Sequence, residues 1–290
     1  MPAAVREVTA FLATLATSAA GPAAADDRLH EDLGLDSLQR LEVLAWLAQR
    51  GVTVGAARGA ELRTVAEVAE LLGTGGAAVP APGGAPAREQ GRPDPGGQPR
   101  AVTLTAGGFA LRPMTPEHLP FLYALATSEQ TGFRWRFRGA VPSQEAFQAA
   151  LTQGVQTQFV VVFQETGEPA GEVVAYNVDH PNGTAYAAAV FRPDLMRTGL
   201  PVDAFLLFLR YLFQVWNFRK VYLEMPSYNF ELIASGAGRW FEIEGRLRDF
   251  TYYAGAFWDE YILAIGRHHV EALSDASFVG AAPGPTGPRL

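Results

Sequence analysis

Residues 29–54 read LHEDLGLDSLQRLEVLAWLAQRGVTV, and this stretch decides the fold of the first part of the chain. An acidic loop leads to Asp36, a residue type that caps helices, and apolar residues then follow at helical spacing. We therefore expect a helix that begins near Ser37 and gathers Leu38 and Leu41 on its apolar side.

Two further segments have the pattern of amphipathic helices. Residues 3–17 repeat apolar side chains at helical spacing, and residues 64–72 read TVAEVAELL. Three such helices would close a small all-α bundle over residues 1–73.

The bundle is followed by a stretch that cannot form a core. Residues 73–98 read GTGGAAVPAPGGAPAREQGRPDPGGQ, without apolar periodicity. Such a segment buries too little surface to offset its ordering entropy. We predict a flexible linker over residues 74–100, a second domain over 101–270 and, from its Gly and Pro content, a disordered tail over 271–290.

Composition excludes several classes of function. The chain has no cysteine, so a thiolate nucleophile and a disulfide are both excluded. The formal net charge of −7 and the lack of a dense Lys/Arg run argue against nucleic acid as a partner. The most apolar stretch, residues 201–216, is shorter than a membrane span. We expect a cytoplasmic protein without a membrane span, and no His spacing suggests a metal site.

The second domain alternates strand and helix patterns. Three β-branched or aromatic runs, at residues 159–163, 173–177 and 185–191, are separated by turn sequences and predict an antiparallel meander. A Phe- and Leu-rich helical segment then precedes a fourth strand at residues 220–225. We expect a mixed, mostly antiparallel central sheet flanked by helices, and hence a multidomain chain of all-α and α/β parts.

The segment Gly34-Leu35-Asp36-Ser37-Leu38 resembles the phosphopantetheine attachment site of acyl and peptidyl carrier proteins. The similarity continues through Leu41-Glu42 and the helix at residues 64–72. It implies that Ser37, flanked by Asp36 and Leu38, is esterified to 4′-phosphopantetheine, whose thiol holds an acyl group. A phosphopantetheinyl transferase is the implied partner, and free N–H groups at the helix start would favour the phosphate.

The second domain resembles the GNAT superfamily of N-acyltransferases. The segments that resemble it are LRPMTPEHLPFL (111–122), GEVVAYNVDHPNG (171–183), RKVYLEMPSYN (219–229) and EIEGRLRDF (242–250). In that family a basic, glycine-containing loop at a helix start binds the pyrophosphate of coenzyme A. The corresponding residues here are 196–201.

This loop departs from the family pattern at its first and last positions, where Met196 and Pro201 stand. The residues implied in cofactor binding are Arg197, Thr198, Gly199 and Leu200. One interpretation is a coenzyme A loop that has drifted while still binding acyl-coenzyme A. The other is a donor on a carrier protein, which needs no nucleotide site.

The catalytic groups usual in the family are also replaced. Tyr186 stands where the resemblance places a glutamate base, and Ser235 with Gly236 stands where it places a tyrosine acid. The remaining catalytic candidates are Glu224, Tyr228, Ser235 and Tyr186, with Glu172 behind them. The Arg- and aromatic-rich residues 133–138 fit either an acceptor or acyl site, or a half-exposed strand.

Three functions remain open. The leading hypothesis is transfer of an acyl chain from the arm on Ser37 to an amine or peptide acceptor, in a polyketide or lipopeptide pathway fed by a fatty-acid or polyketide type synthase. A second is loading of the arm from acyl-coenzyme A, with or without decarboxylation. A third is a silent module that docks or shelters the acyl group.

Overall fold

The computed structural model describes residues 3–15, 23–52, 54–74, 103–106 and 108–275. The predicted linker, residues 74–100, lies outside the described residues except for Thr74, and so does most of the predicted tail, residues 271–290. Residues 271–275 end helix α9 (Arg267–Asp275), which continues past the boundary predicted at residue 270.

The N-terminal helices form the expected bundle. Its helices are α1 (Ala3–Leu15), α2 (Ser37–Gln49), α3 (Ala56–Glu61) and α4 (Val65–Gly73). Asp36 caps α2, and Thr64 caps α4 in a reciprocal box with Glu67. Val8, Leu47 and Val68 are among the side chains that fill the bundle's own core. Helix α3 was not predicted.

The second domain is built on a mixed sheet of eight strands. They are β1 (Leu104–Ala106), β2 (Phe109–Arg112), β3 (Val155–Phe163), β4 (Pro169–Asp179), β5 (Thr184–Phe191), β6 (Lys220–Pro226), β7 (Glu242–Tyr253) and β8 (Ala256–Gly266). Their order is β1-β2-β3-β4-β5-β6-β8-β7, and β5 with β6 is the one parallel pair among them. The mostly antiparallel sheet agrees with the sequence prediction.

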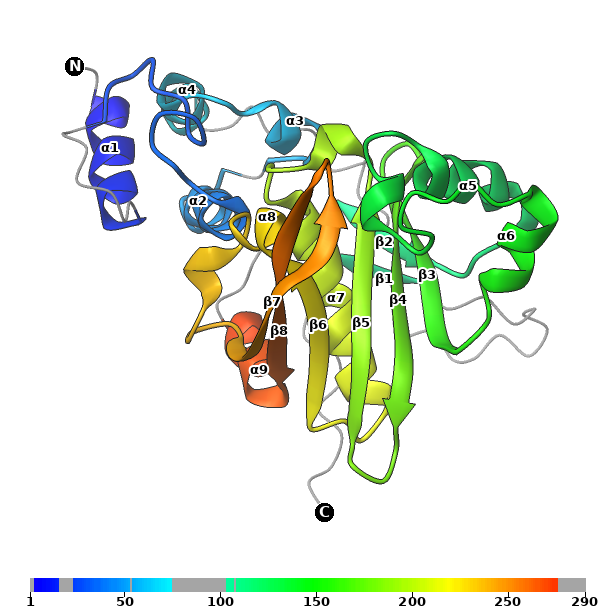
Figure 1. Cartoon of the computed structure of the whole chain (residues 1–290). Coiled ribbons are helices and arrows are strands. Elements are labelled where there is room, and N and C mark those ends of the chain that lie inside the picture. The colour runs from blue at the N-terminus through cyan, green and yellow to red at the C-terminus, as the bar shows by residue number, and fades with distance from the viewer. Residues whose placement is uncertain (1–2, 16–22, 53, 75–102, 107, 276–290) are drawn as a thin grey trace, which may run out of the picture.

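Helices cover the two faces of the sheet unequally (Figure 1). Helix α7 (Leu200–Val215) packs on one face, where Phe208, Leu209 and Leu212 are buried. Helices α5 (Leu119–Thr127) and α6 (Gln144–Ala150) cover part of the other. On this second face the fronts of β5 and β6 remain without a helix in Figure 1, and we call this area the open face.

Short elements complete the domain. They are the 3-10 turns η1 (Pro116–His118), η2 (Gly132–Arg134), η3 (Pro193–Leu195) and η4 (Ala234–Gly236), and the short helix α8 (Ser227–Phe230). Residues 133–138, one interpretation of which was a strand, instead form η2 and a turn. Arg138 and Gly139 there have positive φ, of 47° and 92°, which a strand does not allow. No helix in the described ranges has the length and apolarity of a membrane span.

The bundle packs directly against the second domain. Leu38, Leu41 and Leu44 of α2 belong to the same buried cluster as Leu200 of α7 and Phe241. Figure 1 shows α2 beside α8 at one end of the sheet. The face of α2 that the sequence marked as apolar therefore serves the contact between domains.

Candidate active site

Ser37 is the first residue of α2, and its surroundings are largely closed. Only 7% of the residue is exposed. Its backbone N–H donates to the carbonyl oxygen of Leu232 at 2.9 Å, and the next two amides, of Leu38 and Gln39, donate to the Asp36 carboxylate. The expectation of free N–H groups for a phosphate at this helix start is therefore wrong, because the first-turn amides already have acceptors.

Polar contacts hold the start of α2 on the second domain. Ser235 donates its backbone N–H to Asp36 Oδ2 and its hydroxyl to Asp36 Oδ1, both at 2.9 Å. One turn further along, Glu42 accepts from Arg239 at 2.7 Å. Both contacts join residues almost 200 positions apart in the sequence.

Two glycines allow the backbones to approach closely. A Cβ on Gly199 would lie 2.9 Å from both Leu41 N and Ser37 O. A Cβ on Gly236 would lie 2.5 Å from Leu38 Cδ1. Gly199 also has φ of +84°, which other residues rarely adopt. We call the contact of α2 with Gly199, Ser235, Gly236 and Arg239 the docking face.

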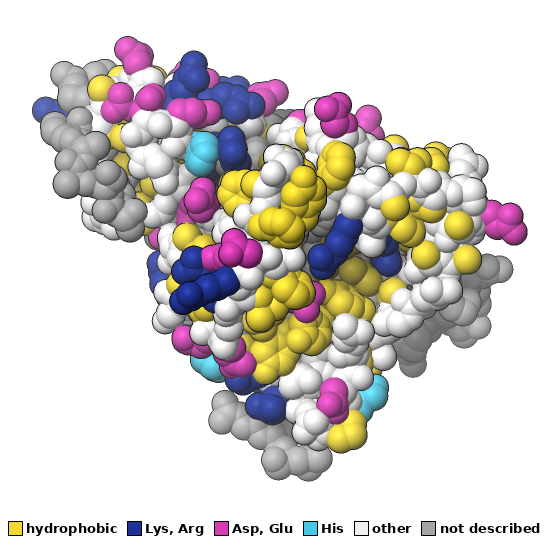
Figure 2. All heavy atoms as spheres, in the orientation of Figure 1, with side chains coloured by type: hydrophobic (Ala, Val, Ile, Leu, Met, Phe, Trp, Pro, Cys, Tyr) yellow, Lys and Arg dark blue, Asp and Glu magenta, His cyan; other side chains and the backbone are white. Residues whose placement is uncertain are grey.

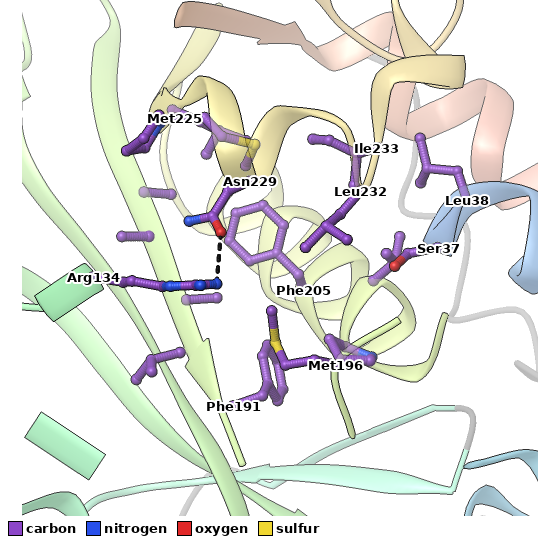
Figure 3. Close-up of a pocket in the computed structure, with 18 of the residues that line it drawn as sticks. Ser37, Leu38, Arg134, Phe191, Met196, Phe205, Met225, Asn229, Leu232 and Ile233 are labelled. Atoms are coloured by element: carbon purple, nitrogen blue, oxygen red, sulfur yellow. Dashed lines mark hydrogen bonds between the residues drawn. The ribbon is translucent and has the colours of Figure 1, made fainter. Parts of the chain in front are cut away.

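A cavity of about 300 Å³ begins at Ser37. Figure 3 shows Ser37 and Leu38 at one end and Arg134 and Met225 at the other, with Phe205 and Leu232 between them. Its walls include residues 187–191 of β5 and 223–226 of β6. These two strands pair only from Thr184 to Tyr186 and from Lys220 to Tyr222, and the cavity lies beside the segments beyond this pairing.

The far end of the cavity holds a fixed arginine. Arg134 donates to Asn229 Oδ1 at 3.0 Å and to the hydroxyl of Tyr253 at 3.4 Å. Its guanidinium carbon lies 5.1 Å from the ring centre of Tyr228 and 5.2 Å from that of Tyr253. Figure 3 shows the side chain reaching across the cavity to Asn229.

Glu224 contributes the one carboxylate among the described lining residues of the cavity. Partial burial, followed by the nearby Glu260, raises its pKa, while Arg138 acts in the opposite direction. A carboxylate with a raised pKa is a better proton acceptor at neutral pH than an ordinary glutamate.

Two tyrosines, Tyr176 and Tyr186, feel the charge of this carboxylate, and a third, Tyr228, lies near Glu260 and Arg134. Burial raises the pKa of Tyr176 to about 12 and also raises the pKa of Tyr186 and of Tyr228. Glu224 adds to the increase for Tyr176 and Tyr186. All three phenols therefore keep their protons at neutral pH and can act as donors.

Two family models match the chain. The phosphopantetheine attachment site matches residues 7–72, and the acetyltransferase (GNAT) domain matches residues 109–233. The chain joins a carrier domain to a GNAT domain. The resemblance and the fold class predicted from the sequence are thus confirmed, and the second match supports an acyltransferase activity.

Solved structures are similar to the GNAT domain at low identity. A GCN5-related N-acetyltransferase from Brucella melitensis is 22% identical, with 61% of this chain and 84% of that chain covered and a TM-score of 0.48. A spermidine N-acetyltransferase from Vibrio cholerae in complex with CoA and spermine is 17% identical, with 57% of this chain and 99% of that chain covered and a TM-score of 0.49. A probable acetyltransferase from Chromobacterium violaceum is 20% identical, with 60% of this chain and 91% of that chain covered and a TM-score of 0.49. None of the curated proteins matches the chain.

The four catalytic candidates do not meet at one place. Glu224 lines the cavity, whereas Tyr186 and Tyr228 are not among its described lining residues and belong to separate aromatic groups. Ser235 lies on the docking face with both its N–H and its hydroxyl given to Asp36 of the carrier domain. Its contacts are those of a docking residue.

Glu172 is buried away from the cavity. It pairs with Arg136 and accepts from Trp135 Nε1 at 3.3 Å, on the face covered by α5 and α6. These contacts are sufficient to explain a buried carboxylate structurally.

The predicted cofactor loop of the GNAT domain has divided roles. Arg197 lines the cavity together with Ser37. Thr198 donates to the Leu195 carbonyl at 2.7 Å, and Leu200 is buried in the shared core. Gly199 lies against the carrier backbone. Only Arg197 of these four is therefore placed to meet a ligand of the cavity.

Sequence reasoning missed three residues of the site. Arg134 was noted only as part of an Arg- and aromatic-rich run, and Asn229 only as the last residue of a segment that resembles the GNAT superfamily. Arg239 has no signal in the sequence, because its partner Glu42 is distant along the chain. No cluster of potential metal ligands occurs among the residues that the structure describes.

Proposed function

We propose that the chain is an N-acyltransferase that moves an acyl group from a phosphopantetheine arm on its own Ser37 to an amine. The observation that carries this proposal is the position of Ser37 at one end of a cavity whose other end contains Arg134 and Met225, the residue that follows Glu224 on β6. An acyl group on an arm at Ser37 would therefore reach the GNAT domain while it stays covalently attached to the same chain.

The residues present fit the implied arm. The cavity walls are mainly apolar, as suits a flexible chain with few charges, and Arg197 lines the same cavity as Ser37, where its charge would offset that of a phosphodiester. When attached, 4′-phosphopantetheine supplies a thiol that holds the acyl group as a thioester.

The docking face favours this donor over free acyl-coenzyme A. Gly199 is at the N-terminus of α7, where the family resemblance places a nucleotide pyrophosphate, and backbone atoms of α2 stand against it. A nucleotide there would have to displace α2. Loading of the arm from acyl-coenzyme A remains the alternative, and it requires an undocked carrier.

Proton transfer is assigned to groups at the far end. The Glu224 carboxylate accepts one proton from the ammonium of the acceptor, so that the free amine can attack the thioester carbonyl. The arm, when attached, would supply the thioester, whose carbon–sulfur bond would break as the carbon–nitrogen bond forms. Tyr228 or Tyr186 would relay the second nitrogen proton to the sulfur. The fixed Arg134 offers positive charge toward the carbonyl oxygen.

The wider setting is also part of the proposal. A phosphopantetheinyl transferase attaches the arm, a synthase of the fatty-acid or polyketide type supplies the acyl group, and the protein works in the cytoplasm on a natural-product pathway. The carrier domain is what supports these partners.

The test follows the mass of the intact protein. Wild type and Ser37→Ala are each treated with a promiscuous phosphopantetheinyl transferase and acyl-coenzyme A. A pool of amines is then added. We expect the acyl-arm mass only in the wild type, followed by loss of the acyl group and appearance of an amide. An arm that keeps its acyl group with every amine would favour the loading or sheltering alternatives. No arm on Ser37 would refute the proposal.

A further inference from the structure

The open face shows which kind of amine the site accepts, an inference that rests on the proposed function. An acceptor must reach the end of the cavity that contains Glu224 and Arg134, and the side of β6 that carries Glu224 faces away from α7. Figure 2 shows this face hollowed near its centre, where yellow surface surrounds dark-blue and magenta side chains.

A row of tyrosines forms one wall beside Glu224. The rings of Tyr176 and Tyr186 are 5.8 Å apart, and those of Tyr186 and Tyr222 are 5.5 Å apart. They come from three neighbouring strands, β4, β5 and β6, in register with one another. Tyr222 and Glu224 are two residues apart on one strand and so point to the same face.

A second aromatic group lies around Arg134, at the same end of the cavity. The ring of Tyr228 lies 4.8 Å from that of Tyr253 and 5.4 Å from that of Trp258. Arg134 stacks on the first two of these rings. A flat apolar body at this end of the cavity would find ring surface in this group as well as in the tyrosine row.

The charges near this entrance suit a single ammonium. Glu224 is exposed, but Glu260 is buried and accepts from the Thr251 hydroxyl. Arg134 and Arg138 add two positive charges, both on exposed residues. One available carboxylate beside two arginines can hold one ammonium group, and a second ammonium would meet like charge.

We propose that the acceptor is a primary amine joined by a short chain to an aromatic ring, with no second positive charge. The ammonium binds at Glu224, and the ring lies along Tyr176, Tyr186 and Tyr222. A polyamine is excluded from this class of acceptor by Arg134 and Arg138.

The test compares three amines on the acylated holo-protein: phenethylamine, an unbranched alkylamine of similar length, and spermidine. We expect the single-turnover rate with phenethylamine to exceed that with the alkylamine by about tenfold, the range of one aromatic contact, and spermidine to be slowest. Tyr186→Leu keeps apolar bulk but removes the ring, so the ratio should fall to about one. Tyr252→Leu removes an exposed tyrosine of β7 and should leave the ratio unchanged.

Binding is measured separately, so that the inference does not depend on turnover. Phenethylamine is titrated by calorimetry into wild type, Tyr186→Leu and Glu224→Gln, and binding to both variants should be weaker. Binding with this pattern but no amide would contradict the proposed function alone. Amide formation without aromatic preference, or faster with spermidine, would overturn the inference alone.

Discussion

The docking face and the open face are the two approaches to one cavity, and they are built differently. The docking face is tightly packed, with Gly199 and Gly236 allowing backbone and Leu38 to approach within contact distance. The open face consists of half-buried tyrosines and charged groups around Glu224. In the proposed function, shape would select the donor, which is carried on one particular helix, whereas charge and ring surface would select the acceptor.

The largest effect is expected on the open face, from Glu224→Gln. Loss of the proton acceptor should slow transfer about 100-fold near neutral pH while leaving attachment of the arm unchanged. Glu271→Gln, at an exposed site on α9, is the matched control. The measurement is the single-turnover rate of loss of the acyl group.

The pH dependence sharpens this prediction. The base must be ionised, so the wild-type rate should rise with pH through the pKa of Glu224, which burial places above that of an ordinary glutamate. This rise of the rate with pH should be absent in Glu224→Gln. The same rise in the variant would show that another group is the base.

On the docking face, Gly199→Ala should slow transfer on the order of 10- to 100-fold, because the added Cβ meets Leu41 N and Ser37 O. Gly238→Ala is the control, since Gly238 has a similar φ of +73° but no atom within 4 Å of its Cβ position. In both variants the alanine must adopt a left-handed backbone conformation, which destabilises the folded state by about 1–2 kcal/mol. Equal rates in the two would show that contact with α2 is unimportant.

Arg239→Glu should change two rates in opposite directions. Docking buries Ser37, so arm attachment requires the undocked carrier and proceeds in proportion to its population. Reversing the charge opposite Glu42 should speed attachment and slow transfer, and the product of the two fold-changes should be about fivefold, the range of a partly exposed ion pair.

The double variant Arg239→Glu with Glu42→Arg should restore both rates toward wild type. Arg248→Glu, at an exposed position on β7, controls for net charge. A change of both rates in the same direction would mean that the pair does not govern docking.

The smallest effect on transfer is expected from Asp203→Asn, which should change stability alone. Burial raises the pKa of Asp203 to about 6. The folded state therefore holds this proton more tightly than the unfolded state, and stability falls as the pH rises from about 4 to about 6. At pH 7.5 the variant should be more stable than wild type by about 2–3 kcal/mol in urea unfolding, and this difference should shrink at pH 5. A difference independent of pH would contradict the account.

Local signals in the sequence predicted much of the fold. Asp36 caps α2 as expected, and the turn at residues 180–183 joins β4 to β5. These features depend on neighbours along the chain. The bend at Arg138 and Gly139 was missed because residues 133–138 alternate as a strand would, although their hydrogen bonds close a turn.

The site was predicted less completely, for a physical reason. Ser235 was proposed as a catalytic residue and Gly199 as part of a cofactor loop, yet both touch α2 of the carrier domain. Contacts between distant segments leave no periodicity or spacing in a single sequence. Glu224 was named as a candidate from the family resemblance, and the structure places it among the residues that line the cavity.

A disulfide tests docking most directly. The chain has no cysteine, so Asp36→Cys with Ser235→Cys introduces a single pair, at two residues whose side chains are 2.9 Å apart. After mild oxidation, intact mass and a non-reducing gel report whether the bond forms within one chain. We predict a monomer that is lighter by two hydrogens, with the bond linking the carrier and GNAT domains. Free thiols, or a disulfide between two chains, would contradict docking of Ser37 at the cavity of its own GNAT domain.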